Sequence, residues 1–195
     1  MRLHKLNRRR RSALATGFPN GQAREDLITH SAMEWAARDP QGPAKWATEK
    51  REGLPKERAL SVIATTWAET DPVAAATFAL NSMKPGRPLD DAVVGIVQRW
   101  AEKDPANTAA WVGQYPEGRL KDAALDNLVG RWVDQDKVAA ASWVSGLAAG
   151  SGQDMAISAY ASKIALTQPA AAALWVERIG SEAIRQQQTE SVSRS

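Results

Sequence analysis

The sequence predicts an all-α fold, an α-solenoid of about five antiparallel helix pairs, which is about ten helices. Three observations lead to this prediction. Alanine is abundant and runs of β-branched residues are scarce, which favours helix over strand. Asp-Pro and related pairs recur every 32 or 33 residues, and all eight Trp stand at two fixed distances from these pairs. A steady period of this size is typical of helical-hairpin repeats.

Residues 1–21 are expected to form a flexible basic arm ahead of the repeats. Residues 1–11 hold six basic and no acidic residues, so the rest of the chain carries 19 basic against 22 acidic residues. Gly17 and Pro19 interrupt any helix here. The arm contains one run of like charges, which is interpreted either as a solvated tail or as an electrostatic handle for nucleic acid, anionic lipid or an acidic protein: Arg8, Arg9, Arg10 and Arg11.

Each repeat is organised around an anchor pair at which one helix ends and the next begins. The pairs are Asp39-Pro40, Asp71-Pro72, Asp104-Pro105, Asp136-Lys137 and Gln168-Pro169. Asp caps the free N–H groups of a first helical turn, and Pro fits the first helical position. Pro also disfavours helix at the residue before it. The aspartates Asp39, Asp71, Asp104 and Asp136 are therefore predicted to be helix caps rather than catalytic carboxylates.

A long helix is predicted before each anchor. The positions 11, 8, 7 and 4 residues before the anchor form one helical face, and Ser31 is the single member that is neither apolar nor aromatic. Ser31 belongs to the first repeat, where a wetter end cap is expected. Glycines and prolines between the repeats mark the links.

Two aromatic columns accompany the anchors, four residues before and seven residues after them. They are interpreted as the repeat core, with a ligand-facing aromatic ladder as the alternative. Their members are Trp35, Trp46, Trp67, Phe78, Trp100, Trp111, Trp132, Trp143 and Trp175.

A shorter helix is predicted after each anchor. Ala stands five residues past every anchor, and this small residue is expected to let two helix backbones approach closely: Ala44, Ala76, Ala109, Ala141 and Ala173. The helical-repeat domain is expected to span residues 22–185. Residues 186–195 are polar and are expected to form a disordered tail.

The motif Trp35-x3-Asp39-Pro40-x5-Trp46 and its copies resemble, in part, the tetratricopeptide class of helical hairpins. A Pro followed six residues later by a Trp is similar to that family's closing Pro and the first Trp of its next repeat. The chain departs from the family because Ala-Thr-Glu-Lys follows Trp46, where Leu-Gly and a Tyr are expected, and because the period is one or two residues short. The resemblance covers about residues 22–180. The family's peptide-binding residues have no matching positions.

No catalytic, cofactor-binding or metal-binding constellation stands out in the sequence. The chain has no Cys and only two His, and no apolar run has the length of a membrane span. The favoured hypothesis is a non-catalytic scaffold that binds a protein or peptide partner on one face of the repeats. The alternative is a protein associated with nucleic acid or an anionic surface through residues 2–11. The sequence leaves the oligomeric state and the cellular compartment open.

Overall fold

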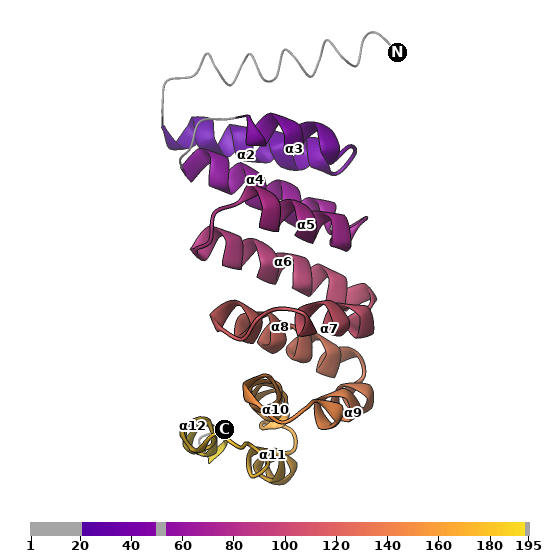
Figure 1. The fold of residues 1–195 in the computed structure, drawn as a ribbon, viewed down its shortest axis with the longest axis vertical. Coiled ribbons are helices and arrows are strands. Elements are labelled where there is room, and N and C mark those ends of the chain that lie inside the picture. The colour runs from indigo at the N-terminus through magenta and orange to yellow at the C-terminus, as the bar shows by residue number, and fades with distance from the viewer. Residues whose placement is uncertain (1–20, 50–53, 194–195) are drawn as a thin grey trace. The chain divides into compact units, whose positions relative to one another are not determined.

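The computed structural model describes residues 21–49 and 54–193, and within them the fold is all-α, as predicted (Figure 1). Eleven helices follow one another in the described residues: α2 (Gln22–Ala36), α3 (Gln41–Thr48), α4 (Leu54–Trp67), α5 (Pro72–Ser82), α6 (Arg87–Lys103), α7 (Pro105–Gly113), α8 (Arg119–Gln135), α9 (Lys137–Gly146), α10 (Ser151–Ile164), α11 (Pro169–Val176) and α12 (Glu182–Ser193). Residues 1–20 of the predicted arm, including Arg8 to Arg11, lie outside the described residues.

The chain divides into two compact units, with the boundary between Ile96 and Val97 inside α6. In the first unit, α2 packs on α3 and α4, and α4 packs on α5. In the second unit, α8 packs on α7, α9 and α10, and α10 packs on α9, α11 and α12. Each unit therefore places a long helix beside the short helix of its own hairpin and beside the next long helix.

The predicted apolar face of the long helices is buried most completely in the third, fourth and fifth repeats. There, all twelve positions of the pattern are buried, among them Ile96, Leu128 and Ile157. In the first repeat only Ala32 of the four is buried. Burial of large aliphatic side chains is the main favourable term in folding, so these helices hold the core.

The two aromatic columns meet at the corners of the second, third and fourth hairpins. The ring centroids of Trp67 and Phe78 lie 5.7 Å apart. The corresponding distances are 5.6 Å for Trp100 and Trp111 and 5.5 Å for Trp132 and Trp143. Separations of this size are those of favourable aromatic pairs. In the fifth repeat Ile164 occupies the first column, and Tyr160, one turn earlier, pairs with Trp175 at 4.6 Å.

The aromatic pairs are only partly enclosed. Trp100 and Trp132 are 7 % exposed, whereas the other members of the columns are half-buried. Gly42 allows a close approach in the first repeat, because a Cβ atom there would lie 2.6 Å from Cζ2 of Trp35. The aromatic rings thus cover the corners, and the aliphatic side chains between the helices form the deepest part of the core.

The anchor aspartates accept hydrogen bonds from the first turn of the short helices. Asp71 accepts from Ala74 N at 2.9 Å, and Asp104 accepts from Asn107 N at 3.0 Å. Asp136 accepts from both Val138 N and Ala139 N. The contact of Asp39 with Gly42 N is longer, at 3.4 Å, and α3 begins one residue later than its counterparts, after Pro40.

Glycine starts the long helices α6 and α8. Gly86 has φ 145° and Gly118 has φ 146°, a conformation that residues with a side chain rarely adopt. The links of the repeat therefore depend on these glycines for their backbone geometry as well as for interrupting the preceding helix.

Two sequence expectations need correction. The recurring Ala five residues past the anchor, expected to let two helix backbones approach closely, is buried in the first three repeats, but Ala141 is half-buried and Ala173 is exposed. The positions four and eight past the anchor are buried in every copy, as at Ala172 and Val176. They lie one turn apart on the face that meets the long helices.

The polar segment expected to be a disordered tail is helical as far as Ser193, in α12. Ile184, Gln188 and Val192 follow one another at a spacing of four residues and are half-buried, on a helix that packs on α10 and α11. Two apolar residues in this seam are too few to stand out as a helical pattern in the sequence, so packing decides the outcome.

Candidate binding groove on the long helices

The anchor aspartates, and the corner aromatics of the second to fourth repeats, contact groups of their own hairpins. The corner aromatics contact each other, and the anchor aspartates bind backbone N–H groups. Arg178 adds a cation–π contact, with its guanidinium carbon 4.3 Å from the centroid of the Trp175 ring. These contacts give the columns and caps a structural role, and a candidate site must be sought on other repeat positions.

A groove of about 490 Å³ runs over the long helices of the second unit. This volume is in the range of small-molecule and peptide sites. We call it the long-helix groove. Its lining residues come from the end of α6 and from α8 and α10: Gln98, Asp126, Asn127, Gly130, Arg131, Asp134, Ala159, Ser162 and Lys163. None of these residues was singled out from the sequence.

Small residues are among those that line the groove, and we call the two less exposed ones, Gly130 and Ala159, its floor. Ser162 also lines the groove but is exposed, and its hydroxyl donates to Gln188 Oε1 at 3.1 Å. Gly130 lies inside α8, five residues before the end of the helix. A Cβ atom added at Gly130 would meet nothing within 4 Å. Glycine inside a helix costs about 0.5–1 kcal/mol relative to alanine. Packing within the described residues therefore does not explain this glycine, whereas an approaching ligand would.

A hydrogen-bonded pair of amides joins α6 to α8 at the groove. Gln98 Nε2 donates to Asn127 Oδ1 at 2.6 Å, and Asn127 Nδ2 donates to the carbonyl oxygen of Ala123 at 2.9 Å. The side-chain amide of Asn127 is thus held in one orientation from two sides. This pair fixes the geometry of the groove wall, since each amide group limits the rotation of the other.

Ion pairs link successive long helices along the groove. Arg131 on α8 lies 3.7 Å from Glu102 on α6, and Lys163 on α10 lies 2.8 Å from Asp134 on α8. The two pairs occupy equivalent repeat positions. Each is solvent-exposed, so its contribution to stability is about 0–1 kcal/mol. Their main effect is to neutralise both cations that line the groove.

A second polar cluster lies where α8 and α10 begin. Glu117 accepts hydrogen bonds from Lys121 Nζ at 2.6 Å and from the Ser151 hydroxyl, and these bonds lower the pKa of its carboxyl group. Burial raises the pKa of Asp122, and the charge of Glu117 adds to this effect while Lys121 opposes it. The cluster ties the link before α8 to the first turn of α10.

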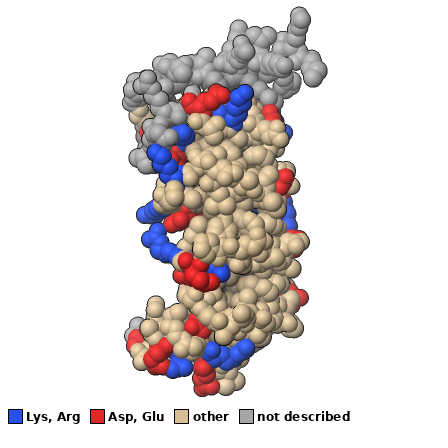
Figure 2. Space-filling view, in the orientation of Figure 1, with Lys and Arg blue, Asp and Glu red and all other residues tan. Residues whose placement is uncertain are grey.

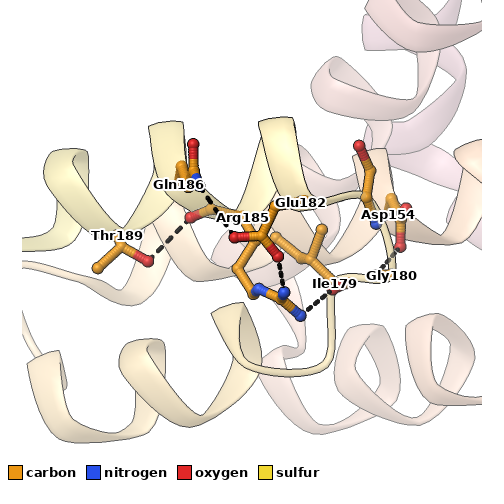
Figure 3. A network of polar contacts seen from close by, with 8 residues as sticks. Asp154, Ile179, Gly180, Glu182, Arg185, Gln186 and Thr189 are labelled. Carbon is orange, nitrogen blue, oxygen red and sulfur yellow. Dashed lines mark hydrogen bonds and ion pairs between the residues drawn. The ribbon is translucent and has the colours of Figure 1, made fainter.

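Asp154 ties α10 to the start of α12 (Figure 3). Its buried carboxylate accepts hydrogen bonds from Gly180 N at 2.8 Å and from Ser181 N at 2.9 Å. Arg185 on α12 donates to the carbonyl oxygen of Ile179 at 3.2 Å and pairs with Glu182. Few apolar side chains of α12 take part in its packing, so this network of polar contacts helps to hold the helix in place.

The short helices of the second unit offer a different surface. The helices α7 and α11 contain no charged residue, and α9 contains only Lys137. Figure 2 shows a largely uncharged surface over α7 and α9. Val138 and Leu174 are exposed there among alanines and serines. A hollow of about 140 Å³ beside α11, lined by Ala173, Val176 and Glu177 together with residues of α12, is smaller than the long-helix groove.

Within residues 21–49 and 54–193, no three side chains of the His, Cys, Asp and Glu types gather closely enough to hold a metal ion. In the same part of the chain, no helix combines the length and the apolar character needed to cross a membrane. Comparison of the chain with protein-family models, with curated proteins and with solved structures gives no match.

Two signals in the sequence point to the interhelical contacts that sequence reasoning missed. The position five before the anchor is basic in the last three repeats, and the position two before it is acidic in the second, third and fourth. The position fourteen before the anchor is acidic in all five: Glu25, Glu57, Asp90, Asp122 and Asp154. Both patterns repeat along the chain, but the residues that these side chains contact lie about one repeat away in the sequence.

Proposed function

We propose that the chain is a non-catalytic scaffold of helical repeats that binds a protein or peptide partner in the long-helix groove. The observation that carries this proposal is the open floor at Gly130, between fixed amides and paired charges. Natural helices seldom keep an interior glycine that has no packing role, because alanine would be more stable. We further propose that the hairpins form a repeat class similar to the tetratricopeptide class, on the strength of their period and corner motif.

The chemistry of the groove suits an extended peptide. Side chains from three successive long helices line it, so a ligand lying across these helices would meet equivalent positions in turn. Small residues on the floor leave room for a backbone, and polar residues on the rim supply hydrogen-bonding groups. A rim of this kind orients a ligand, and exclusion of water from the floor adds affinity.

The proposal is tested by blocking the groove. Gly130→Gln places a long side chain on the floor, and glutamine is a better helix former than glycine, so the helix is expected to persist. Ser142→Gln, on the exposed face of α9, is the matched control. Partners recovered from a native-host extract with the wild-type chain should remain with Ser142→Gln and be lost with Gly130→Gln. Equal recovery by both variants would place the binding surface elsewhere.

The alternative function, association with nucleic acid or an anionic surface, depends on the basic arm. We propose it as the second candidate because residues 1–11 hold six basic residues and no acid. Binding through such an arm would weaken steeply with salt and show little sequence preference. Deletion of residues 2–11 should abolish binding to RNA or DNA and leave recovery of a groove partner unchanged. Loss of the groove partner on this deletion would argue against two separate surfaces.

A further inference from the structure

Two acids and two cations line the long-helix groove, Asp126 and Asp134 with Arg131 and Lys163, but they are not all paired. Arg131 and Lys163 are each held by an acid of a neighbouring helix, Glu102 and Asp134. Asp126 also lines the groove and is exposed, but it has no hydrogen bond or ion pair with any described residue. Among the charged residues that line the groove, Asp126 is therefore the one without a partner in the described part of the chain.

Asp126 and Gly130 are neighbours on the surface of α8. They are four residues apart in one helix, so they lie one turn apart on the same face, with about 5–6 Å between the Cβ positions. A Lys or Arg stem could lie over Gly130, which offers no side chain, while its charged end reaches Asp126. Long basic side chains commonly bury their methylene groups in this way and keep the charge solvated.

An acidic ligand fits the same groove poorly. Its carboxylate would have to displace Glu102 or Asp134 from an existing ion pair, and it would also approach Asp126. Juxtaposed like charges cost binding free energy, so Asp126 discriminates against acidic segments. A neutral segment would leave Asp126 without compensation but would meet no repulsion.

We propose that the long-helix groove selects a basic peptide segment, an extended chain whose Arg or Lys side chain crosses Gly130 and meets Asp126. This inference rests on the proposed function, because it names the chemical class of the partner that the groove takes. The cation is recognised by a single exposed carboxylate, so its contribution is that of one surface ion pair.

The test uses two synthetic peptides with blocked ends and alanines on both sides of one central residue. One peptide carries arginine there, and the other carries citrulline, which has nearly the same shape without the charge. Titrations of the full-length, 15N-labelled chain would follow the amide signals of Gly130 and Ser162. The arginine peptide should shift these signals and bind at least about threefold more tightly than the citrulline peptide.

Two variants separate the charge from the groove. Asp126→Asn should weaken binding of the arginine peptide by about threefold and remove the preference for it over the citrulline peptide. Asp91→Asn, the same change at an exposed acid of α6, should leave the affinity and the preference unchanged. Equal binding of the two peptides, abolished by Gly130→Gln, would overturn the basic-segment inference and retain the groove as a peptide site. Absence of binding, or shifts unaffected by Gly130→Gln, would overturn both.

Discussion

Asp122 and Asp126 lie one turn apart on α8, yet their surroundings differ. Asp126 is exposed and lines the groove, whereas Asp122 is half-buried in the first turn of the helix. Burial, followed by the charge of Glu117, raises the pKa of Asp122, and Lys121 only partly offsets this. The charged form of Asp122 is therefore less favourable in the folded chain than in the unfolded chain.

Asp122→Asn is expected to raise the free energy of unfolding at pH 7. A carboxyl group with a raised folded-state pKa stabilises the fold only while it is protonated, and this stabilisation is lost as the pH rises through the folded-state pKa. The advantage of the variant should therefore be present at neutral pH and vanish below about pH 4, the ordinary pKa of aspartate. Urea unfolding at pH 7 and at pH 3 measures both values.

Glu117→Gln, in the same cluster, is expected to change the free energy of unfolding in the opposite direction. Hydrogen bonds from Lys121 and Ser151 lower the pKa of Glu117, so its charged form favours the folded chain. This stabilisation is present above the unfolded-state pKa and is lost as the pH falls through the lowered value. The variant should be less stable than wild type at pH 7. Changes of the same sign in both variants would contradict the assignment of these shifts.

At the scale of the helices, the sequence predicts where the hairpin corners lie better than it predicts which helix faces are buried. A corner depends on local chemistry: an Asp that caps, a Pro that starts a helix and two aromatics at fixed distances. The sequence does not predict α12, because a remote carboxylate, Asp154, holds the two residues that precede the helix. On the short helices, the position four residues past the anchor is buried in every copy, whereas the recurring Ala stands one residue later. Sequence alone does not reveal which face of these helices turns inward.

Trp100→Ala is expected to lower the free energy of unfolding by about 3–5 kcal/mol, the usual cost of removing a buried aromatic ring. Trp100 is 7 % exposed and pairs with Trp111. Trp111→Ala removes the half-buried partner and should cost less. Urea or guanidinium unfolding gives both values. Wild-type stability in Trp100→Ala would show that the ring is not part of the core and would revive the ligand-facing alternative.

Asp154→Asn is expected to loosen the start of α12. Asparagine offers one carbonyl oxygen in place of two carboxylate oxygens, so one of the Gly180 and Ser181 N–H groups loses its acceptor. The local cost should be about 1–3 kcal/mol. Hydrogen exchange should accelerate in α12 and stay unchanged in α8. Asp126→Asn is the control. Equally slow exchange in α12 of the wild type and of both variants would show that Asp154 does not cap this helix.

At the scale of the whole chain, the repeat separates positions that maintain the fold from positions that vary. The period predicts the hairpins because every copy must satisfy the same corner. It does not predict the groove, because the groove depends on how Gln98, Gly130 and Ser162 of three different copies line up across α6, α8 and α10. A mid-helix glycine is visible in the sequence, but only the structure places open space above it.

We propose that Gly130 keeps the groove open for a partner at a cost in stability. Gly130→Ala tests it when unfolding and partner recovery are measured on the same protein. We expect the variant to have a free energy of unfolding higher by about 0.5–1 kcal/mol together with weaker partner binding. Higher stability with undiminished binding would contradict a functional groove, and lower stability would show that Gly130 serves packing instead.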